Sequence, residues 1–354
     1  MAPPSIAELV DDPIGRYPAA TVACFDPTRG ELPRRVLDEH RTVEYLQRLA
    51  AVGAESLLIA SSTGQGHLRT VAELEAWFQC AASADVGGAL LMALLRPEDG
   101  PAVNERMLDL VAAAGYAAVF FRPGTDLPAG AADEAVAASL APLVNAAADR
   151  GLAIGLYSVP DVSGLPLTAE AAARVLDAPG GERVVAIKVT ERDYDTSTRV
   201  FLRDGRLSRL KIVQGWDPHL ARALGDGPAS DPAGRQRAGI TSGLMALAPQ
   251  QYLHLIRAAE QGDWAEVGEA QAAVNRLFAA MQDDPNHFAD LQRAKYAMGL
   301  GHPLLATIRE GQAARIMTAL ESVPRSADRR RLAAGLDLMG DGPFHEALLA
   351  LQAE

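Results

Sequence analysis

Three groups of residues in this sequence could carry chemistry at the ends of predicted strands. Lys188 closes the apolar run "VVAI", Tyr157 closes the run "AIGL", and the turn "SSTG" (61–64) follows the run "SLLIA". An ammonium group is costly to bury in an apolar strand, so a lysine there must be neutralised or used. A lysine enclosed by apolar groups favours the neutral amine, which can attack a carbonyl carbon and form a Schiff base.

A Schiff base with a 2-oxo acid gives these residues a shared reaction. The protonated imine is an electron sink, so a bond to C3 can break and leave an enamine, as in a class I aldolase. Tyr157 can move the proton on and off the substrate oxygen, and Ser62 can relay it. The hydroxyl and N–H groups of Ser62, Thr63 and Gly64 could bind the carboxylate of the oxo acid.

Short apolar runs alternate with amphipathic helical patterns along most of the chain. Strands are predicted at 20–25, 56–60, 89–95, 117–121, 153–157, 184–188, 211–214 and 238–242. Helices are predicted at 36–52, 71–83, 101–114, 132–150, 168–178, 195–202 and 217–224 and after Pro249. Eight strand–helix units predict an α/β fold, a (β/α)8 TIM barrel, whose active site gathers at the C-terminal ends of the strands.

Only helical patterns continue after residue 261. We therefore predict an N-terminal lead-in (1–17), a (β/α)8 barrel (18–261) and a C-terminal helical region (262–354). The segment 225–237, rich in Gly, Pro, Ser and Asp, is predicted to be a surface loop without secondary structure.

Composition restricts the class of partner. The 354 residues carry a net charge of -12, which argues against nucleic acid and anionic membranes as partners. No apolar run approaches the ~20 residues that span a bilayer, and the N-terminus does not resemble a signal peptide. Two cysteines, Cys24 and Cys80, make a disulfide framework improbable, so we expect a cytoplasmic protein. The seven histidines show no metal-ligand spacing, and we predict neither a metal nor a cofactor.

Several motifs, in order, resemble the superfamily of dihydrodipicolinate synthase and N-acetylneuraminate lyase. They are "SSTGQ" (61–65) for G-[ST]-T-G-E, "YSVPDVSG" (157–164) for Y-N-x-P-x-x-[ST]-G, "IKVT" (187–190), "GWD" (215–217) and "GITSGLMALAP" (239–249). The resemblance covers most of residues 18–300. It implies a Schiff-base (β/α)8 enzyme, commonly a homodimer or homotetramer.

The resemblance also implies roles for individual residues. Lys188 forms the imine, Tyr157 shuttles protons, and Ser62 with Thr63 binds the carboxylate of the 2-oxo acid. The substrate-binding set that we predict is Ser62, Thr63, Gly64, Thr190, Gly215, Asp217 and Ser242. Thr190 and Asp217 would face the hydroxylated end of a longer substrate. Asp217 could instead cap the helix that Pro218 begins.

Departures from the family pattern bear on the substrate. Val162 stands where dihydrodipicolinate synthases place an arginine for a substrate carboxylate, and "FFRPGTD" (120–126) lacks their second tyrosine. Lysine biosynthesis is therefore disfavoured, and a neutral or hydroxylated aldehyde is the expected partner of the 2-oxo acid. Arg122 and Arg192 could supply a cation from other loops.

Other departures keep alternatives open. Gln65, Ser158 and Ala246 replace a glutamate and two asparagines of the pattern. One alternative is a synthase-like condensation or the dehydration of a sugar acid. Another is a 2-oxo-acid-binding protein that has lost turnover. A lone lysine at a strand end is ordinarily a solvated surface residue, so the catalytic interpretation of Lys188 depends on the ordered set of motifs.

Overall fold

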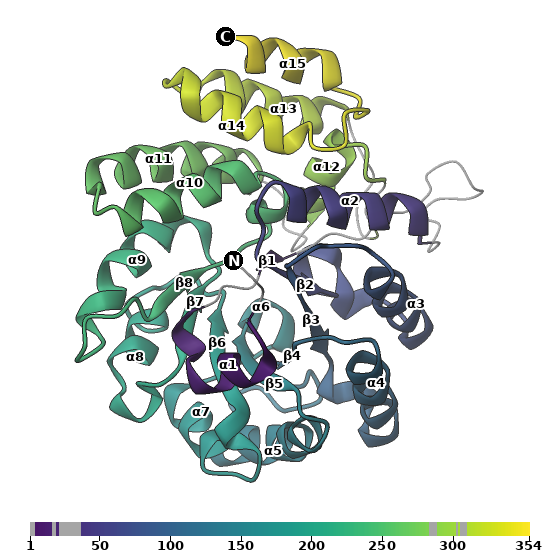
Figure 1. Cartoon of the computed structure of the whole chain (residues 1–354), viewed down its shortest axis with the longest axis vertical. Helices are drawn as coiled ribbons and strands as arrows, with labels where there is room; N and C mark the ends of the chain where they lie inside the picture. The colour runs from purple at the N-terminus through teal and green to yellow at the C-terminus, as the bar shows by residue number, and fades with distance from the viewer. Residues whose placement is uncertain (1–3, 16–18, 21–36, 283–288, 302–303, 305–309) are drawn as a thin grey trace. The chain divides into compact units, whose positions relative to one another are not determined.

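The computed structural model describes residues 4–15, 19–20, 37–282, 289–301, 304 and 310–354 (Figure 1). The chain divides into two compact units, which are described separately. The first comprises Met1–Pro18, Glu55–Ile59 and Gly88–Thr241. The second comprises Ala19–Ala54, Ala60–Gly87 and Ser242–Glu354.

The first unit contains a curled parallel sheet. Neighbouring strands pair in chain order: β2 (Ser56–Ile59), β3 (Leu90–Leu95), β4 (Ala118–Phe121), β5 (Ala153–Ser158), β6 (Val184–Val189), β7 (Lys211–Gln214) and β8 (Ala238–Ile240). Every residue of these strands is buried, as expected for a parallel sheet covered on both faces. The sequence prediction is confirmed for these seven strands, whereas most of the strand predicted at 20–25 lies outside the described residues.

Helices join the parallel strands, as crossover connections require. They follow β3 to β7 and surround the outer face of the sheet: α4 (Pro101–Ala113), α5 (Asp133–Asp149), α7 (Ala169–Leu176), α8 (Thr198–Arg203) and α9 (Leu220–Ala229) (Figure 1). Shorter segments stand at the strand ends: η4 (Pro97–Asp99), α6 (Pro160–Ser163), η6 (Gly205–Leu207) and η7 (Asp217–His219).

The loop predicted at 225–237 is wrong in its first part, because α9 continues to Ala229. Gly227 explains the difference: a Cβ at this residue would lie 1.7 Å from Gln236 Oε1 and 2.8 Å from Ala238 N. The missing side chain allows the end of the helix to pack against β8. A glycine interpreted as a loop signal therefore serves a close approach between elements.

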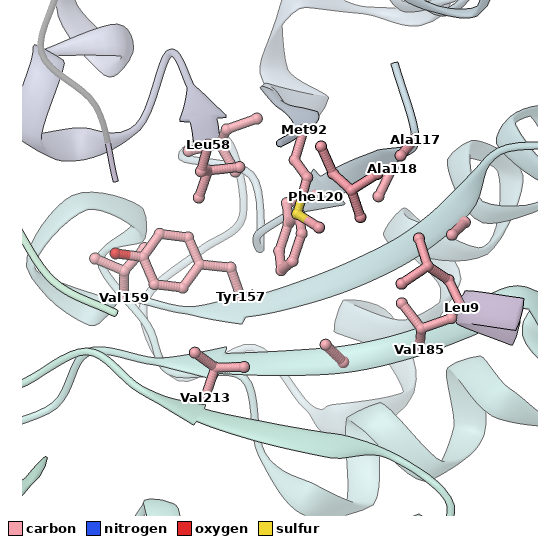
Figure 2. Close-up of a cluster of buried hydrophobic side chains, with 14 residues drawn as sticks. Leu9, Leu58, Met92, Ala117, Ala118, Phe120, Tyr157, Val159, Val185 and Val213 are labelled. Carbon is pink, nitrogen blue, oxygen red and sulfur yellow. The ribbon is translucent and has the colours of Figure 1, made fainter. Parts of the chain in front are cut away.

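A cluster of apolar side chains fills the interior of the curled sheet (Figure 2). Leu9 of α1 (Ile6–Asp11) meets residues at the first positions of the strands, such as Val185, while Tyr157 and Val159 belong to the same cluster at the opposite ends. The predicted lead-in thus contains a helix, begun by a capping box between Ser5 and Glu8. The packed interior therefore holds the C-terminal ends of the strands in place.

The second unit consists mainly of helices. They are α2 (Glu39–Ala51), α3 (Val71–Ala82), α10 (Pro249–Glu260), α11 (Trp264–Ala280), α12 (Ala289–Ala297), α13 (Glu310–Glu321), α14 (Ser326–Leu336) and α15 (His345–Ala353). The short helices η2 (Ser62–Gly64), η3 (Gly66–Leu68) and η8 (Leu244–Ala246) and the strand β1 (Ala19–Ala20) also belong to it. The described part of the chain after residue 261 is helical, as predicted. Among the helices described, none has the length and apolarity needed to cross a membrane.

Candidate active site

Lys188 and Tyr157 lie side by side at the C-terminal ends of β6 and β5. The two residues are register partners in the sheet, and Lys188 Nζ lies 4.3 Å from the centroid of the Tyr157 ring. Both side chains are buried, with 3% and 1% of their surface exposed. In the part of the chain that the structure describes, the Lys188 amine makes no hydrogen bond or ion pair. Because the amine has no such partner there, its nitrogen is available to a carbonyl compound.

Thr190 and Gly215 complete this group. Tyr157 Oη donates a hydrogen bond to Thr190 Oγ1 over 3.1 Å, and Thr190 N donates to Ser158 O over 2.9 Å. A Cβ at Gly215 would lie 2.3 Å from Thr190 Oγ1, so the glycine leaves the space that the threonine hydroxyl occupies. The structure therefore brings together four of the predicted residues and makes Thr190 the hydrogen-bond partner of the tyrosine.

Asp217 is buried and is the first residue of η7. The N-cap residue of that helix is Trp216, so the capping role considered for Asp217 is wrong. Asp217 lies two residues after Gly215, beyond the C-terminal end of β7, and Gly215 is the glycine that adjoins the Thr190 hydroxyl. A role in substrate binding stays a prediction.

Glu191 follows Thr190 at the C-terminal end of β6, and the family motifs did not indicate it. Ser158 Oγ accepts a hydrogen bond from Leu167 N over 2.9 Å and donates one to the Glu191 carboxylate. Burial raises the pKa of Glu191, the hydrogen bond from Ser158 opposes this shift, and the charges of Asp161 and Asp193 add to it. In the sequence, the position of Glu191 directly after Thr190 was the feature that could have indicated that it lies near the site.

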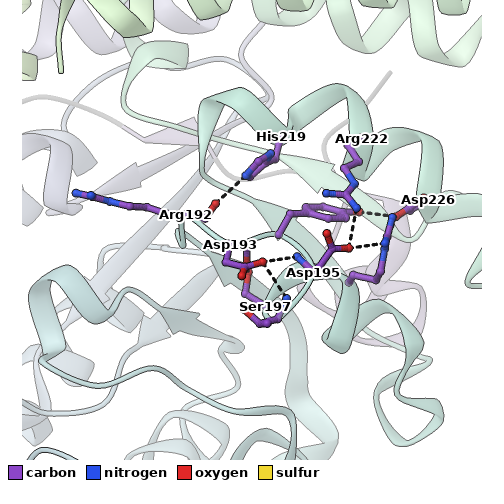
Figure 3. Close-up of polar contacts among 10 residues, drawn as sticks. Arg192, Asp193, Asp195, Ser197, His219, Arg222 and Asp226 are labelled. Atoms are coloured by element: carbon purple, nitrogen blue, oxygen red, sulfur yellow. Dashed lines mark hydrogen bonds and ion pairs between the residues drawn. The ribbon is translucent and has the colours of Figure 1, made fainter.

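The two arginines that could have supplied a cation differ in their surroundings. Arg122 is buried and its guanidinium forms a bidentate ion pair with Glu98. Arg192 is exposed and stacks over the Trp216 ring, with 5.5 Å from its guanidinium carbon to the ring centroid. Figure 3 shows its side chain extending away from the neighbouring ion pairs. Of these two arginines, Arg192 is the one that keeps an accessible positive charge.

Polar contacts fix the loop that follows β6 (Figure 3). His219 Nε2 lies 2.8 Å from Arg192 O, and Asp193 Oδ1 accepts from Asp195 N over 2.9 Å. Tyr194 Oη donates to Asp226 over 2.9 Å. This loop begins at Thr190, so the contacts hold in place the backbone that carries the partner of Tyr157.

The predicted carboxylate-binding turn lies in the second unit. Ser62, Thr63 and Gly64 form η2 and are buried. Three main-chain hydrogen bonds of 2.9–3.1 Å close the turn, donated by the N–H groups of Gly64, Gln65 and Gly66. The N–H groups of Gly64, Gln65 and Gly66 are therefore engaged within the turn, and contact of Ser62 and Thr63 with substrate stays a prediction.

Ser242 has a structural position in the same unit. Its Oγ accepts a hydrogen bond from Met245 N and donates one to Tyr252 Oη, each over 3.1 Å. The side chain therefore joins the turn at η8 to α10. Its predicted contact with substrate stays a prediction.

Comparison with known proteins finds a family whose model matches part of this chain. The model of the Dihydrodipicolinate synthetase family matches residues 144–310, which include Lys188, Tyr157 and Thr190. The predicted resemblance to this family is confirmed. None of the curated proteins matches this sequence.

Solved structures share the fold. A prophage protein of the dihydrodipicolinic acid synthase family from E. coli K12, in complex with pyruvate, has a TM-score of 0.72 and 17% identity over 87% of this chain and 98% of its own. A variant of 2-keto-3-deoxygluconate aldolase from Sulfolobus solfataricus has a TM-score of 0.68 and 14% identity over 87% and 96%. Dihydrodipicolinate synthase from Aquifex aeolicus has a TM-score of 0.68 and 15% identity over 86% and 97%.

The structure assigns contacts to the three departures from the dihydrodipicolinate synthetase pattern. Gln65 Oε1 accepts a hydrogen bond from Leu304 N over 2.9 Å, and the main-chain oxygen of Ala246 accepts from Tyr45 Oη over 2.6 Å. Ser158 bonds Leu167 and Glu191, as described above. The side chains of Gln65 and Ser158 thus make hydrogen bonds, whereas at Ala246 the bond is made by the main chain.

Proposed function

We propose that this protein is a class I, Schiff-base-forming lyase or aldolase that acts on pyruvate or a related 2-oxo acid together with a neutral or hydroxylated aldehyde. The observation that carries the proposal is the buried Lys188 amine against the Tyr157 ring, with the Tyr157 hydroxyl held by Thr190. The match to the dihydrodipicolinate synthetase family and the pyruvate complex of a protein with the same fold support it.

The proposed reaction begins at Lys188. Its amine attacks the C2 carbonyl of the oxo acid, and loss of water gives the imine. Removal of a proton from C3 gives an enamine, whose C3 attacks the aldehyde carbon; the reverse sequence cleaves the same bond. Hydrolysis of the product imine restores the free amine.

Tyr157 is the proposed proton shuttle. Its hydroxyl is fixed by Thr190 and its ring lies against the attacking amine, so one group is near both the imine nitrogen and the oxygen that leaves. We propose Thr190 as the direct partner in the relay, a role that the sequence analysis had considered for Ser62 as a neighbouring hydroxyl. Ser62 and Thr63 are proposed to bind the carboxylate of the oxo acid.

A neutral acceptor is favoured by the charges at the strand ends. Val162 offers no cation, Arg122 is neutralised by Glu98, and Glu191 adds a carboxyl group beside Thr190. An acceptor with its own carboxylate would need a paired cation to offset its desolvation.

The remaining predictions complete the proposal. Closure of the parallel sheet into a (β/α)8 barrel, the three-part division at 17/18 and 261/262, and assembly as a homodimer or homotetramer stay proposals drawn from the sequence. So do a cytoplasmic location and the substrate contacts of Gly64, Thr190, Gly215, Asp217 and Ser242.

The test is to incubate the protein with a panel of 2-oxo acids and borohydride, then to measure the intact mass. Borohydride reduces the imine to a stable secondary amine, so we expect a mass gain that corresponds to one reduced oxo acid per chain. A mass unchanged with every oxo acid would remove the enzyme proposal.

A further inference from the structure

The turn that we propose to bind the oxo-acid carboxylate has a strained backbone. Ala60 and Gln65, the two non-glycine residues with positive φ in the described part of the chain, flank it at φ 63° and 57°. A Cβ at Gly66 would lie only 1.9 Å from Ala60 O, so the ends of the turn are in close contact. Strained conformations persist only where the surrounding structure enforces them, and they gather at functional sites.

Arg69 is the side chain that holds this turn. It is buried, with 4% of its surface exposed, and its Nε and Nη2 both donate to Gly64 O, over 3.1 and 2.8 Å. Its guanidinium carbon lies 5.2 Å from the centroid of the buried Trp77 ring on α3. The next residue, Thr70, caps that helix in a capping box with Glu73. Arg69 is therefore itself anchored.

The orientation of the Gly64 peptide decides what the turn presents to a ligand. With its carbonyl bonded twice to Arg69, the same peptide directs the N–H of Gln65 to Ser62 O. A flipped peptide would lose these bonds and turn a carbonyl oxygen in a new direction, where it could repel an anion. The guanidinium also places a positive charge within hydrogen-bond distance of the turn, which favours a carboxylate bound there.

We propose that Arg69 is a positioning residue for the 2-oxo acid: it fixes the Gly64 carbonyl so that Ser62 and Thr63 present their hydroxyls to the carboxylate. The inference rests on the proposed function and concerns binding of the oxo acid rather than the chemical step. Arg69 lies outside the family motifs considered above, and its role follows from its contacts alone.

The experiment measures the pyruvate concentration that gives half-maximal borohydride trapping in wild type and in Arg69→Met. Methionine keeps an apolar stem against Trp77 but removes the charge and both donors. We expect the half-saturating concentration to rise roughly tenfold, the usual effect of losing a charge-assisted hydrogen bond. The adduct at saturating pyruvate and its rate of formation should change less than about threefold, because the reacting groups are unaltered.

Arg237→Met is the matched control. Arg237 is also buried and donates to main-chain carbonyls, with Nη1 to Leu202 O over 2.6 Å and Nη2 to Leu207 O over 2.7 Å, but it belongs to the first unit and lies just before β8. We expect this change to lower the melting temperature without moving the half-saturating concentration. An equal rise in the control would overturn the proposal.

Arg69→Lys is a second variant, which allows the same measurement if the Arg69→Met protein does not fold. Lysine retains the charge and one donor, so we expect a half-saturating concentration a few-fold above that of wild type. A wild-type value in a folded Arg69→Lys or Arg69→Met protein would show that Arg69 does not position the oxo acid, while trapping itself would still support the proposed function. A wild type that traps none of the 2-oxo acids of the panel would instead refute the function.

Discussion

The two buried lysines on neighbouring strands have opposite surroundings. Lys188 is the second-last residue of β6 and Lys211 the first of β7, and they are 3% and 1% exposed. Lys211 Nζ donates to Ile14 O and, over 2.8 Å, to Gln236 O. Lys188 Nζ faces the Tyr157 ring, and no hydrogen bond to it occurs among the described residues.

Under the proposed function, this difference separates a structural lysine, Lys211, from a reactive one, Lys188. At the N-terminal ends of the strands, main-chain carbonyls stabilise the ammonium of Lys211 and fix the segment after α1. At the C-terminal ends, the Lys188 amine has the face of the Tyr157 ring beside it. In (β/α)8 barrels, function lies at the C-terminal ends of the strands and stability at the other ends, and the roles that we propose for these two residues follow that division.

The largest expected effects come from exchanging each lysine for methionine. Lys188→Met should abolish turnover and leave the melting temperature almost unchanged, because it removes the nucleophile and little packing. Lys211→Met should keep trapping with pyruvate but lose about 1–3 kcal/mol of stability, since two buried carbonyls lose their donor. Turnover and thermal unfolding measure both. Turnover in a folded Lys188→Met protein would contradict the comparison.

Tyr157→Phe should produce the next largest effect. It keeps the ring beside Lys188 but removes the hydroxyl bonded to Thr190, so the rate should fall by about 10²–10⁴ while binding of the oxo acid changes little. Thr190→Val should give a smaller loss, because it removes only the partner of the hydroxyl. Steady-state rates with saturating oxo acid are the readout, and a loss below about tenfold for Tyr157→Phe would indicate another proton shuttle.

Gly215→Ala tests whether the space beside Thr190 matters. The new Cβ would lie 2.3 Å from Thr190 Oγ1 and would displace the hydroxyl from Tyr157. We expect a rate loss of about tenfold, comparable to Thr190→Val and not additive with it. Gly205→Ala is the control, because a Cβ at Gly205 meets no atom within 4 Å. Equal rates in the two alanine variants would show that the hydroxyl position is unimportant.

The acceptor preference should be a more modest effect. Paired aldehydes of similar size, one with a carboxylate and one without, should react with a higher kcat/KM for the neutral member, because Arg122 is engaged by Glu98. Arg192→Gln should leave this preference unchanged. A preference for the acidic aldehyde that disappears in Arg192→Gln would show that the exposed arginine over Trp216 binds the acceptor.

The smallest expected effect concerns Glu191 and pH. The pKa of Glu191 is raised in the folded chain, so the protonated carboxyl is compatible with folding and the charged one is not favoured. The folded protein therefore loses stability as pH rises through that pKa and the group becomes charged. Glu191→Gln is neutral at every pH and should therefore raise the melting temperature slightly at pH 7. The gain should vanish below pH ~4, where an unfolded glutamate is protonated as well. A gain that persists there would assign the effect to packing.

The elements that position the site were predictable because their patterns are local. The strands that carry Tyr157 and Lys188 are continuous apolar runs, and the prediction placed both residues at the strand ends. The S-x-x-E pattern of Ser5 and Glu8 marked α1 in the same way, although the prediction treated this segment only as a lead-in. The end of α9 was missed because the close approach at Gly227 depends on a strand that comes later in the chain.

Contacts between side chains that are distant in the sequence were harder to predict. Thr190 was assigned to substrate, but its hydroxyl bonds Tyr157, which lies on the neighbouring strand. The Glu191–Ser158 hydrogen bond and the Arg69–Gly64 pair join residues whose separation follows no repeating pattern. Such partners are selected by strand register and turn geometry, which the order of motifs does not specify.

Mapping the borohydride adduct to a single residue tests the central claim most directly. The protein is trapped with pyruvate, digested and sequenced by fragmentation mass spectrometry, and the peptides that contain Lys188 and Lys211 are compared. We expect the reduced pyruvyl group on Lys188 and an unmodified Lys211, with no adduct in Lys188→Met. An adduct on Lys211, or on any lysine other than Lys188, would contradict the account.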